Sequence, residues 1–390
     1  MKRNLAFILI WMSLIVFLGF YQYPERSNDQ IKLVETCPPG FMLNEQNECE
    51  SRNLYMQYSS LYNKGVGGLK TALPTGRQKF SPQQIDLGRY LFFDPVLSSD
   101  NTLSCANCHD PDLGFSDGRA RSLGKNDIPL DRSAPSLWNV AYYKSFFWDA
   151  RATTLEEQMV GPLYSEKEMG STPEELLEKL NGIEAYQNLF ALAFPDRSSS
   201  DDISLNEIYT SIVAFESSLI SLNSRYDQYA HGYHDALSKK EIEGLNIFRS
   251  FVARCAECHT PPLFTNQQIA VLGTPDPKGM PFDPGAEIPN GDPTLRGGFK
   301  VPSLRNIEKT APYMHSGNFE TLKEVVQFYT DGRGHAVPEE EELILHWHIW
   351  EPNLSEYELD RLVDFLKTLT DESFKPVTPK TLPSGLTIYN

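Results

Sequence analysis

Two five-residue segments constrain this chain more than any other feature: Cys105-Ala106-Asn107-Cys108-His109 and Cys255-Ala256-Glu257-Cys258-His259. Each reads C-x-x-C-H, the pattern of a covalently attached c-type haem. One helical turn brings both thiols to the same side, where they can form thioethers with one porphyrin, and the next histidine can ligate the iron. A redox disulfide or a four-cysteine zinc site would explain the cysteines but not the histidine after each pair. We therefore expect two haem c groups, attached through these four cysteines, with His109 and His259 as proximal ligands.

The sequence around the two motifs repeats at the scale of domains. A Gly-x-x-x-Phe pair precedes each motif, and an apolar helical face follows it, with the predicted helices at 208–222 and 359–369. The interval from His109 to Phe215 equals the interval from His259 to Phe365, at 106 positions. A small residue on one helix lets an aromatic side chain of another approach closely. We therefore expect two tight helix crossings, in which Gly88 and Gly244 meet Phe215 and Phe365.

These crossings resemble those of the class I cytochrome c fold, whose first and last helices cross around the haem. Helix starts are predicted at Ser81-Pro82 and at Ser238. Strand patterns are nearly absent, so the expected fold is all-α: two class I cytochrome c-like domains with long loops, each holding one haem. We divide the chain into a membrane anchor or signal (1–23), a tether (24–80), a first cytochrome c domain (81–234) and a second domain with its tail (235–390).

The N-terminus carries Lys2 and Arg3 before an apolar run that extends over residues 5–20. This run is long for a cleavable signal and just long enough to span a bilayer. We expect an uncleaved anchor in the inner membrane, with a cleaved signal peptide as the alternative. Either way, the body of the protein is expected in the periplasm. Cys37 and Cys49 are expected to form a disulfide in that oxidising compartment.

Acidic residues outnumber basic ones, 52 to 35, which gives a net charge of -17. This balance argues against nucleic acid and anionic lipid surfaces as partners and favours a soluble cationic partner. Glu339 to Glu342 form an acidic patch, either a solvated loop or a docking rim. His346, Trp347, His348 and Trp350 form an aromatic cluster to which the sequence assigns no function.

The second axial ligand of each iron decides function. No histidine lies between His109 and His231, so the first haem has no local distal histidine. Met159 and Met169 follow the first motif, and Met169 lies at a plausible distance for an electron carrier. Glu168 precedes Met169, and adjacent residues on a regular element do not both point at one iron.

Three segments resemble the bacterial dihaem cytochrome c peroxidase/MauG family: LGRYLFFDPVLSSDNTLSCANCHDPDLGFSDGRA, APSLWNVAYYKSFFWDARATTLEEQMVGPL and FKVPSLRNIEKTAPYMHSGNFETLKEVVQFY. The resemblance runs from about residue 80 to 372. It implies that Trp148 relays electrons between the haems. It also implies that Gln158 and Glu168 face peroxide at the first haem, with Pro162 packing the open side. A carboxylate there can take a proton from H2O2 and return it to the leaving oxygen.

The sequence departs from the family pattern at two ligand positions. Peroxidases that need prior reduction carry a histidine after a Ser-x-Gly, where this chain has Lys125. Lysine is a poor ligand while its amine is protonated, so the first haem is expected to be five-coordinate from the outset. The distal ligand of the second haem is methionine in ordinary members and tyrosine in MauG-like ones. The matching position is Tyr329, with Met314 and His315 as nearby alternatives.

The resemblance also implies a Ca²⁺ ion between the haems, with Thr310 and Pro312 at positions that supply backbone carbonyls. The asparagine expected among its ligands is Ser133 here. Serine is a weaker calcium ligand than an amide carbonyl.

The expected function is reduction of H2O2 to water with electrons from a small cytochrome c or cupredoxin. The first alternative is a MauG-like oxidase that uses H2O2 to oxidise a protein or small molecule at long range. The second is an electron carrier or redox sensor with both irons closed, for instance by Met169 and Met314. No nucleic acid partner is expected, and a homodimer is left open.

Overall fold

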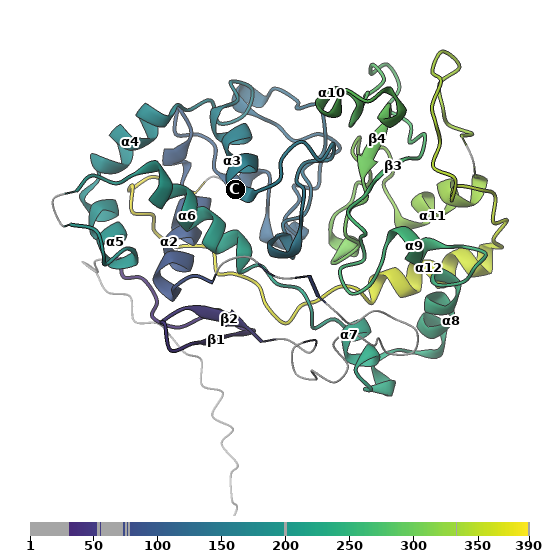
Figure 1. The fold of residues 1–390 in the computed structure, drawn as a ribbon, viewed down its shortest axis with the longest axis horizontal. Coiled ribbons are helices and arrows are strands. Elements are labelled where there is room, and N and C mark those ends of the chain that lie inside the picture. The colour runs from purple at the N-terminus through teal and green to yellow at the C-terminus, as the bar shows by residue number, and fades with distance from the viewer. Residues whose placement is uncertain are drawn as a thin grey trace, which may run out of the picture. The chain divides into compact units, whose positions relative to one another are not determined.

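The computed structural model describes residues 31–52, 55, 73–74, 76, 79–198, 201–332 and 334–388. Residues from Lys32 onward form one compact unit, and its path is drawn in Figure 1. The predicted anchor at 1–23 lies outside the described residues. Within the described ranges, no helix has the length and apolar character needed to cross a membrane.

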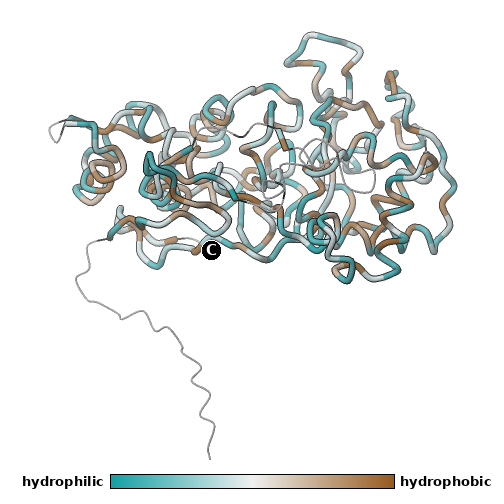
Figure 2. Tube along the Cα trace, turned by 60° about the horizontal axis from the view of Figure 1, so that its bottom comes forward, coloured by the Kyte–Doolittle hydropathy of each residue, from teal (hydrophilic) through white to brown (hydrophobic). Residues whose placement is uncertain are grey.

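Helices dominate the part of the chain that the structure describes. They are α2 (Pro82–Phe93), α3 (Leu155–Tyr164), α4 (Pro173–Asn181), α5 (Glu184–Ala193), α6 (Leu205–Ser217), α7 (Arg225–Ala230), α8 (Lys239–Phe248), α9 (Cys255–Cys258), α10 (Glu287–Asn290), α11 (Leu322–Asp331) and α12 (Glu356–Lys367). Ser81 and Ser238 cap α2 and α8 with capping boxes, which confirms both predicted starts. Hydrophobic and hydrophilic stretches alternate along the helical coils in Figure 2, as expected for helices with one buried face.

Two small antiparallel sheets accompany the helices, so the fold is mostly helical but not free of strands. β1 (Phe41–Leu43) pairs with β2 (Cys49–Ser51), and β3 (Ile269–Val271) pairs with β4 (Gly298–Lys300). Each strand has three residues, which is too short for an alternating pattern to stand out in the sequence.

The disulfide between Cys37 and Cys49 is present, as predicted. It fastens the β1–β2 hairpin, which is attached to the helical body by backbone hydrogen bonds. The amide of Cys49 donates to the carbonyl of Phe80 at 2.7 Å, and the amide of Val34 donates to Asp86 on α2 at 3.0 Å. This part of the predicted tether is therefore packed in place.

The helices α2 and α6 cross at Gly88 on the left of Figure 1. A Cβ atom on Gly88 would lie 1.8 Å from the carbonyl oxygen of Ser211 and 2.9 Å from the Cβ of Phe215. The rings of Phe92 and Phe215 then meet at a centroid distance of 5.0 Å. Only glycine permits this approach, so the predicted crossing is confirmed.

The helices α8 and α12 repeat this geometry on the right of Figure 1. A Cβ atom on Gly244 would lie 1.9 Å from the carbonyl oxygen of Arg361 and 2.8 Å from the Cβ of Phe365. The rings of Phe248 and Phe365 are also 5.0 Å apart. The helical crossing therefore occurs once in each half of the chain.

A buried ion pair anchors the second half. Arg305 donates to both carboxylate oxygens of Asp227, at 2.5 and 2.7 Å, and both side chains are 0% exposed. Tyr55 donates to the same carboxylate at 2.5 Å. Tyr226, next to Asp227 on α7, packs with Phe365 in one hydrophobic core. Helix α7 precedes the predicted boundary at 234/235, yet it packs with the second half.

Candidate haem and peroxide site

The first C-x-x-C-H motif opens onto a cavity of about 720 Å³. Cys105, Cys108 and His109 all line it, because a 3-10 turn over Cys105–Asn107 directs them to one side. The Nδ1 atom of His109 lies 2.9 Å from the carbonyl oxygen of Phe115, to which it donates. Burial lowers the pKa of His109, so the imidazole is neutral. This arrangement leaves Nε2 available for a metal.

The second motif arranges its histidine in the same way. Helix α9 carries Cys255 and Cys258, and Nδ1 of His259 lies 3.1 Å from the carbonyl of Phe264 and 3.2 Å from that of Pro302. Burial lowers the pKa of His259 to about 4. Each motif therefore presents two cysteines and one neutral, oriented imidazole.

The residues of the first cavity fit a covalently attached haem. The two thiols would bond the porphyrin, Nε2 of His109 would bind the iron, and the cavity would hold the ring. The buried Nε of Arg121, which also lines the cavity, has no hydrogen-bond partner among the described residues. A propionate group of the haem would supply an acceptor for such a donor.

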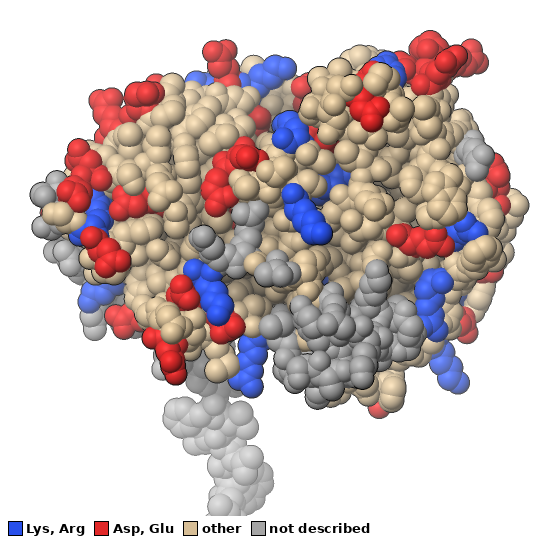
Figure 3. All heavy atoms as spheres, viewed as in Figure 1, with Lys and Arg blue, Asp and Glu red and all other residues tan. Residues whose placement is uncertain are grey.

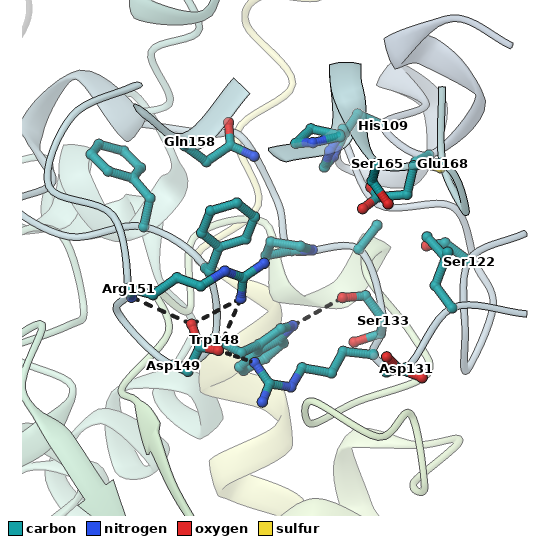
Figure 4. Close-up of a pocket in the computed structure, with 18 of the residues that line it drawn as sticks. His109, Ser122, Asp131, Ser133, Trp148, Asp149, Arg151, Gln158, Ser165 and Glu168 are labelled. Carbon is teal, nitrogen blue, oxygen red and sulfur yellow. Dashed lines mark hydrogen bonds and ion pairs between the residues drawn. The ribbon is translucent and has the colours of Figure 1, made fainter. Parts of the chain in front are cut away.

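Glu168, Gln158 and Pro162 converge on the cavity that contains His109. In the view of Figure 4, Gln158 and Glu168 lie on either side of His109. Gln158 and Pro162 belong to α3, and Glu168 lies in the turn that follows this helix. Burial raises the pKa of Glu168, while Arg151 and a hydrogen bond from Ser165 oppose the rise. The carboxyl group is therefore easier to protonate than an exposed one.

Lys125, which replaces the expected histidine, points away from this cavity. Its Nζ donates to Ser99 Oγ at 2.7 Å and lies 3.8 Å from Asp100. The neighbouring Gly124 packs so closely on the turn before Glu168 that a Cβ there would lie 1.8 Å from the carbonyl of Lys167. The amine is thus held outside, while the backbone braces the turn that carries Glu168.

Met169 lines the same cavity as Glu168, which corrects one step of the sequence argument. Residues 166–169 form a turn rather than a helix or strand. Neighbouring side chains in a turn are not forced to opposite sides, so the position of Glu168 does not exclude Met169. Met159 also borders the cavity.

Trp148 is held by residues from both halves of the chain. Its indole nitrogen donates to the carbonyl of Ser133 at 2.9 Å, and its own carbonyl accepts from the amide of Lys300 at 2.7 Å. Figure 4 shows the indole in the same cavity as His109.

An ion-pair network that sequence reasoning missed fixes the segment around Trp148. Arg132 joins Asp149 to Asp283, with both contacts at 2.7 Å, and Arg151 also bonds to Asp149. Asp149 and Arg151 closely follow Trp148 in the sequence, but nothing in the spacing indicates Asp283.

Tyr329 lies beside the second motif. Burial, and then the nearby Cys258 and Cys255 thiols, raise the pKa of its phenol well above the ordinary value. Of the alternatives, Met314 is fixed among the described residues only through its backbone carbonyl, which accepts from Ser133 Oγ at 2.9 Å, and this leaves its sulfur uncommitted. His315 stacks on Phe299, with ring centroids 3.7 Å apart.

The calcium candidates Thr310 and Pro312 lie in the loop that precedes Met314. Thr310 packs on the first-motif loop, where a Cβ on Gly114 would lie 2.8 Å from its Cγ2. Ser133, which replaces the expected asparagine, donates its hydroxyl proton to the backbone carbonyl of Met314. This bond uses the hydroxyl proton and leaves the oxygen lone pairs of Ser133 able to face a cation.

Comparisons with known proteins agree with this geometry. The family model for di-haem cytochrome c peroxidase matches residues 82–235. The methylamine utilization protein MauG of Methylorubrum extorquens is 34% identical over 75% of this chain and 79% of its own length. The cytochrome c551 peroxidase of Nitrosomonas europaea is 33% identical over 75% of this chain and 83% of its own.

Solved structures give the same result. The crystal structure of a MauG-like protein associated with microbial copper homeostasis superposes with a TM-score of 0.70 at 33% identity. The match covers 79% of this chain and 96% of that one. Sequence and structure agree over most of both chains, and the two C-x-x-C-H motifs lie inside the shared region: the chain belongs to the di-haem cytochrome c peroxidase family, which includes the MauG proteins.

Proposed function

We propose that this protein reduces H2O2 to water at the first haem site, with electrons that enter through the second. The observation that carries the proposal is the convergence of Glu168 and Gln158 on the cavity of His109. When bound, the haem irons supply peroxide binding and electron transfer. The balanced reaction takes two electrons and two protons per H2O2 and releases two waters.

The side chains of the cavity handle the protons. Glu168 as a carboxylate accepts the proton of the bound peroxide and, as the acid, returns it to the leaving oxygen. Its raised pKa suits both roles, because a general acid–base group works best with a pKa near the working pH. Gln158 donates a hydrogen bond from its amide to an oxygen of the peroxide.

Trp148 would carry electrons between the two haem sites. Its indole donates to Ser133 and its backbone carbonyl accepts from the amide of Lys300, so the residue is tied to both halves. The network of Arg132 and Asp149 fixes the neighbouring backbone. Two class I cytochrome c-like domains, each built on one of the crossing helix pairs, would then form the two halves of the enzyme.

The second candidate function is a MauG-like oxidation of another protein or a small molecule. The position of Tyr329 beside Cys255 and Cys258 favours it, because a tyrosine ligand stabilises oxidised iron. The two functions differ in the source of the two electrons that reduce H2O2. A peroxidase consumes two equivalents of reduced cytochrome c or cupredoxin per H2O2, whereas the MauG-like enzyme consumes peroxide while its own substrate is oxidised.

The experiment that tests the proposal is a stopped-flow titration of the purified dihaem protein with H2O2 and a reduced small cytochrome c. Two donor equivalents oxidised per peroxide support the peroxidase. Consumption of one equivalent of peroxide per protein without donor oxidation supports the MauG-like enzyme, because the protein itself then supplies the two electrons. No consumption at all refutes both.

We place the protein in the periplasm, because haem c attachment and the Cys37–Cys49 disulfide both suit an oxidising compartment. Fractionation, with N-terminal sequencing of the mature protein, separates an anchored chain from a cleaved one, and light scattering tests the homodimer. A Ca²⁺ ion held by the carbonyls of Thr310 and Pro312 belongs to the proposal. A chelator that leaves both haem spectra and turnover unchanged would remove it.

A further inference from the structure

Residues 346–350, His-Trp-His-Ile-Trp, lie against the second haem-binding motif. Ring nitrogens of His346 and His348 and the sulfur of Cys258 all lie within 4.8 Å of one another. The sulfur of Cys258 would form one of the two thioether bonds to the second porphyrin. The two imidazoles therefore border the point where the second haem would be attached.

Several contacts hold this segment rigidly. His348 Nε2 lies 2.7 Å from the carboxylate of Glu257, a residue inside the motif itself. The amide of His346 donates to the carbonyl of Val271 on β3 at 2.8 Å, and Trp350 Nε1 donates to the carbonyl of Val252 at 2.9 Å. The segment is thus fixed at both ends, whereas the approach of His348 to Glu257 lacks the geometry of a hydrogen bond.

Trp347 connects this buried contact to the surface. Its ring lies 3.5 Å from that of His348, centroid to centroid, yet the residue is 68% exposed. Ile344 and Phe251 are also exposed, at 66% and 74%. Tryptophan is seldom left this exposed without a partner, and exposed apolar groups of this kind mark interaction sites.

A metal ion is the competing occupant, because two imidazoles and a thiol at this spacing can ligate one. Thioether formation removes the thiolate of Cys258, however, so only the two imidazoles would remain as good ligands. A metal site would also give no role to the exposed indole of Trp347. Electron transfer uses the close approach of Trp347, His348 and Cys258.

We propose that Trp347 is the surface end of the electron route between the second haem site and a protein partner, with His348 linking it to Cys258. This inference rests on the proposed function. In the peroxidase, a reduced partner loses one electron at Trp347 and the second haem gains it, and two such transfers serve one H2O2. In a MauG-like reaction the electron travels the other way, from the oxidised substrate.

The charge of the same segment indicates the partner. Glu339, Glu340, Glu342 and Glu351 are exposed on the chain that carries Trp347. Acidic side chains gather on the projection at the upper right of Figure 3, where Figure 1 draws the loop that follows α11. The partner is therefore a small redox protein with an apolar contact surface ringed by Lys and Arg.

The first test follows where oxidising equivalents leave the protein. The dihaem protein is treated with H2O2 without any donor, and oxidised tryptophan is mapped by peptide mass spectrometry. We expect oxidation at Trp347 well above that at Trp350, and His348→Ala should lower it about tenfold. The His348 ring packs on Trp347, so His348→Ala uncovers more of the indole and direct oxidation by H2O2 from solution would rise. Oxidation that is unchanged or higher in this variant would therefore overturn the route.

The second test compares two donors. Reduction of the second haem is followed by stopped flow, with a basic small cytochrome c and with ascorbate. In Trp347→Ala the ratio of the cytochrome rate to the ascorbate rate should fall about tenfold. Tyr357→Phe, a change at another exposed aromatic residue, is the control and should keep the wild-type ratio. An unchanged ratio in Trp347→Ala refutes this inference alone, whereas a wild type that never consumes peroxide refutes the proposed function.

Discussion

Replacement of Glu168 by glutamine tests the chemistry of the cavity most selectively. Glutamine keeps the size of the side chain and an acceptor oxygen, but it cannot take or return a proton. Glu168 is half-buried, and burial raises the pKa of its carboxyl group. The substitution therefore removes the proton relay while the cavity keeps its shape.

The expected loss follows from the role of the group. General acid–base assistance contributes about 10² to 10⁴ in rate, which corresponds to about 2.7 to 5.4 kcal/mol of transition-state stabilisation. The pH profile should change as well. In the wild type the carboxylate must be ionised to accept the proton, so the rate should fall as the pH drops through the raised pKa of Glu168. Glu168→Gln should lack this acidic limb.

The assay is the single-turnover rate of peroxide consumption, measured from pH 4.5 to 8. Glu166→Gln is the matched control, because Glu166 is exposed on the same turn and does not line the cavity. Both variants should retain both haem spectra. A Glu168→Gln protein with wild-type turnover would show that the carboxyl group has no part in the reaction.

Four further predictions concern the fold and the second site. Gly88→Ala should lower the free energy of unfolding by about 3 kcal/mol, because the new Cβ meets a backbone carbonyl, whereas Gly182→Ala should be nearly neutral in the same denaturant titration. Arg305→Met should cost about 3–5 kcal/mol by leaving the Asp227 carboxylate buried and unpaired. Arg305 also holds the pKa of Asp227 below its ordinary value against burial. In the wild type this stabilisation is complete above about pH 4 and is lost as the pH falls through the lower, folded-state pKa. Thermal melts at several pH values measure it, and a melting temperature that rises as the pH falls below about 4 would contradict the prediction. Tyr329→Met should raise the reduction potential of the second haem in a spectroelectrochemical titration, and an unchanged potential would remove Tyr329 as a ligand.

The helix crossings could be predicted because their signal is local. Gly88 and Gly244 stand one helical turn before a phenylalanine, and equal intervals place Phe215 and Phe365 opposite them. Helix ends were harder to predict. The helix expected to reach Leu222 ends at Ser217. The prediction ran too far because the apolar pattern continues into the stretch after the helix, where Leu222 is still buried. The spacing of apolar residues reflects which side chains are buried, and a buried loop can show the same spacing as a helix.

The site could be predicted in part. The motif residues and Glu168 follow from spacing and from the family resemblance, and the cavity brings Glu168 to His109. The contacts of Arg132 with Asp283, and of His348 with Glu257, join residues far apart in the sequence. No spacing rule encodes such pairs, since they depend on how loops return to the site. The disulfide hairpin was predictable as a bond, but its packing on α2 was not.

The central claim is that the first haem site is open to peroxide while the second is closed. Its most direct test is the EPR spectrum of the all-ferric protein before and after one equivalent of H2O2. We expect one high-spin and one low-spin haem, with the high-spin signal consumed by peroxide. Two low-spin haems that peroxide leaves unchanged would contradict it. Met169 or Met159 would then be the first residues to replace, because an electron carrier with a closed first iron would explain that spectrum.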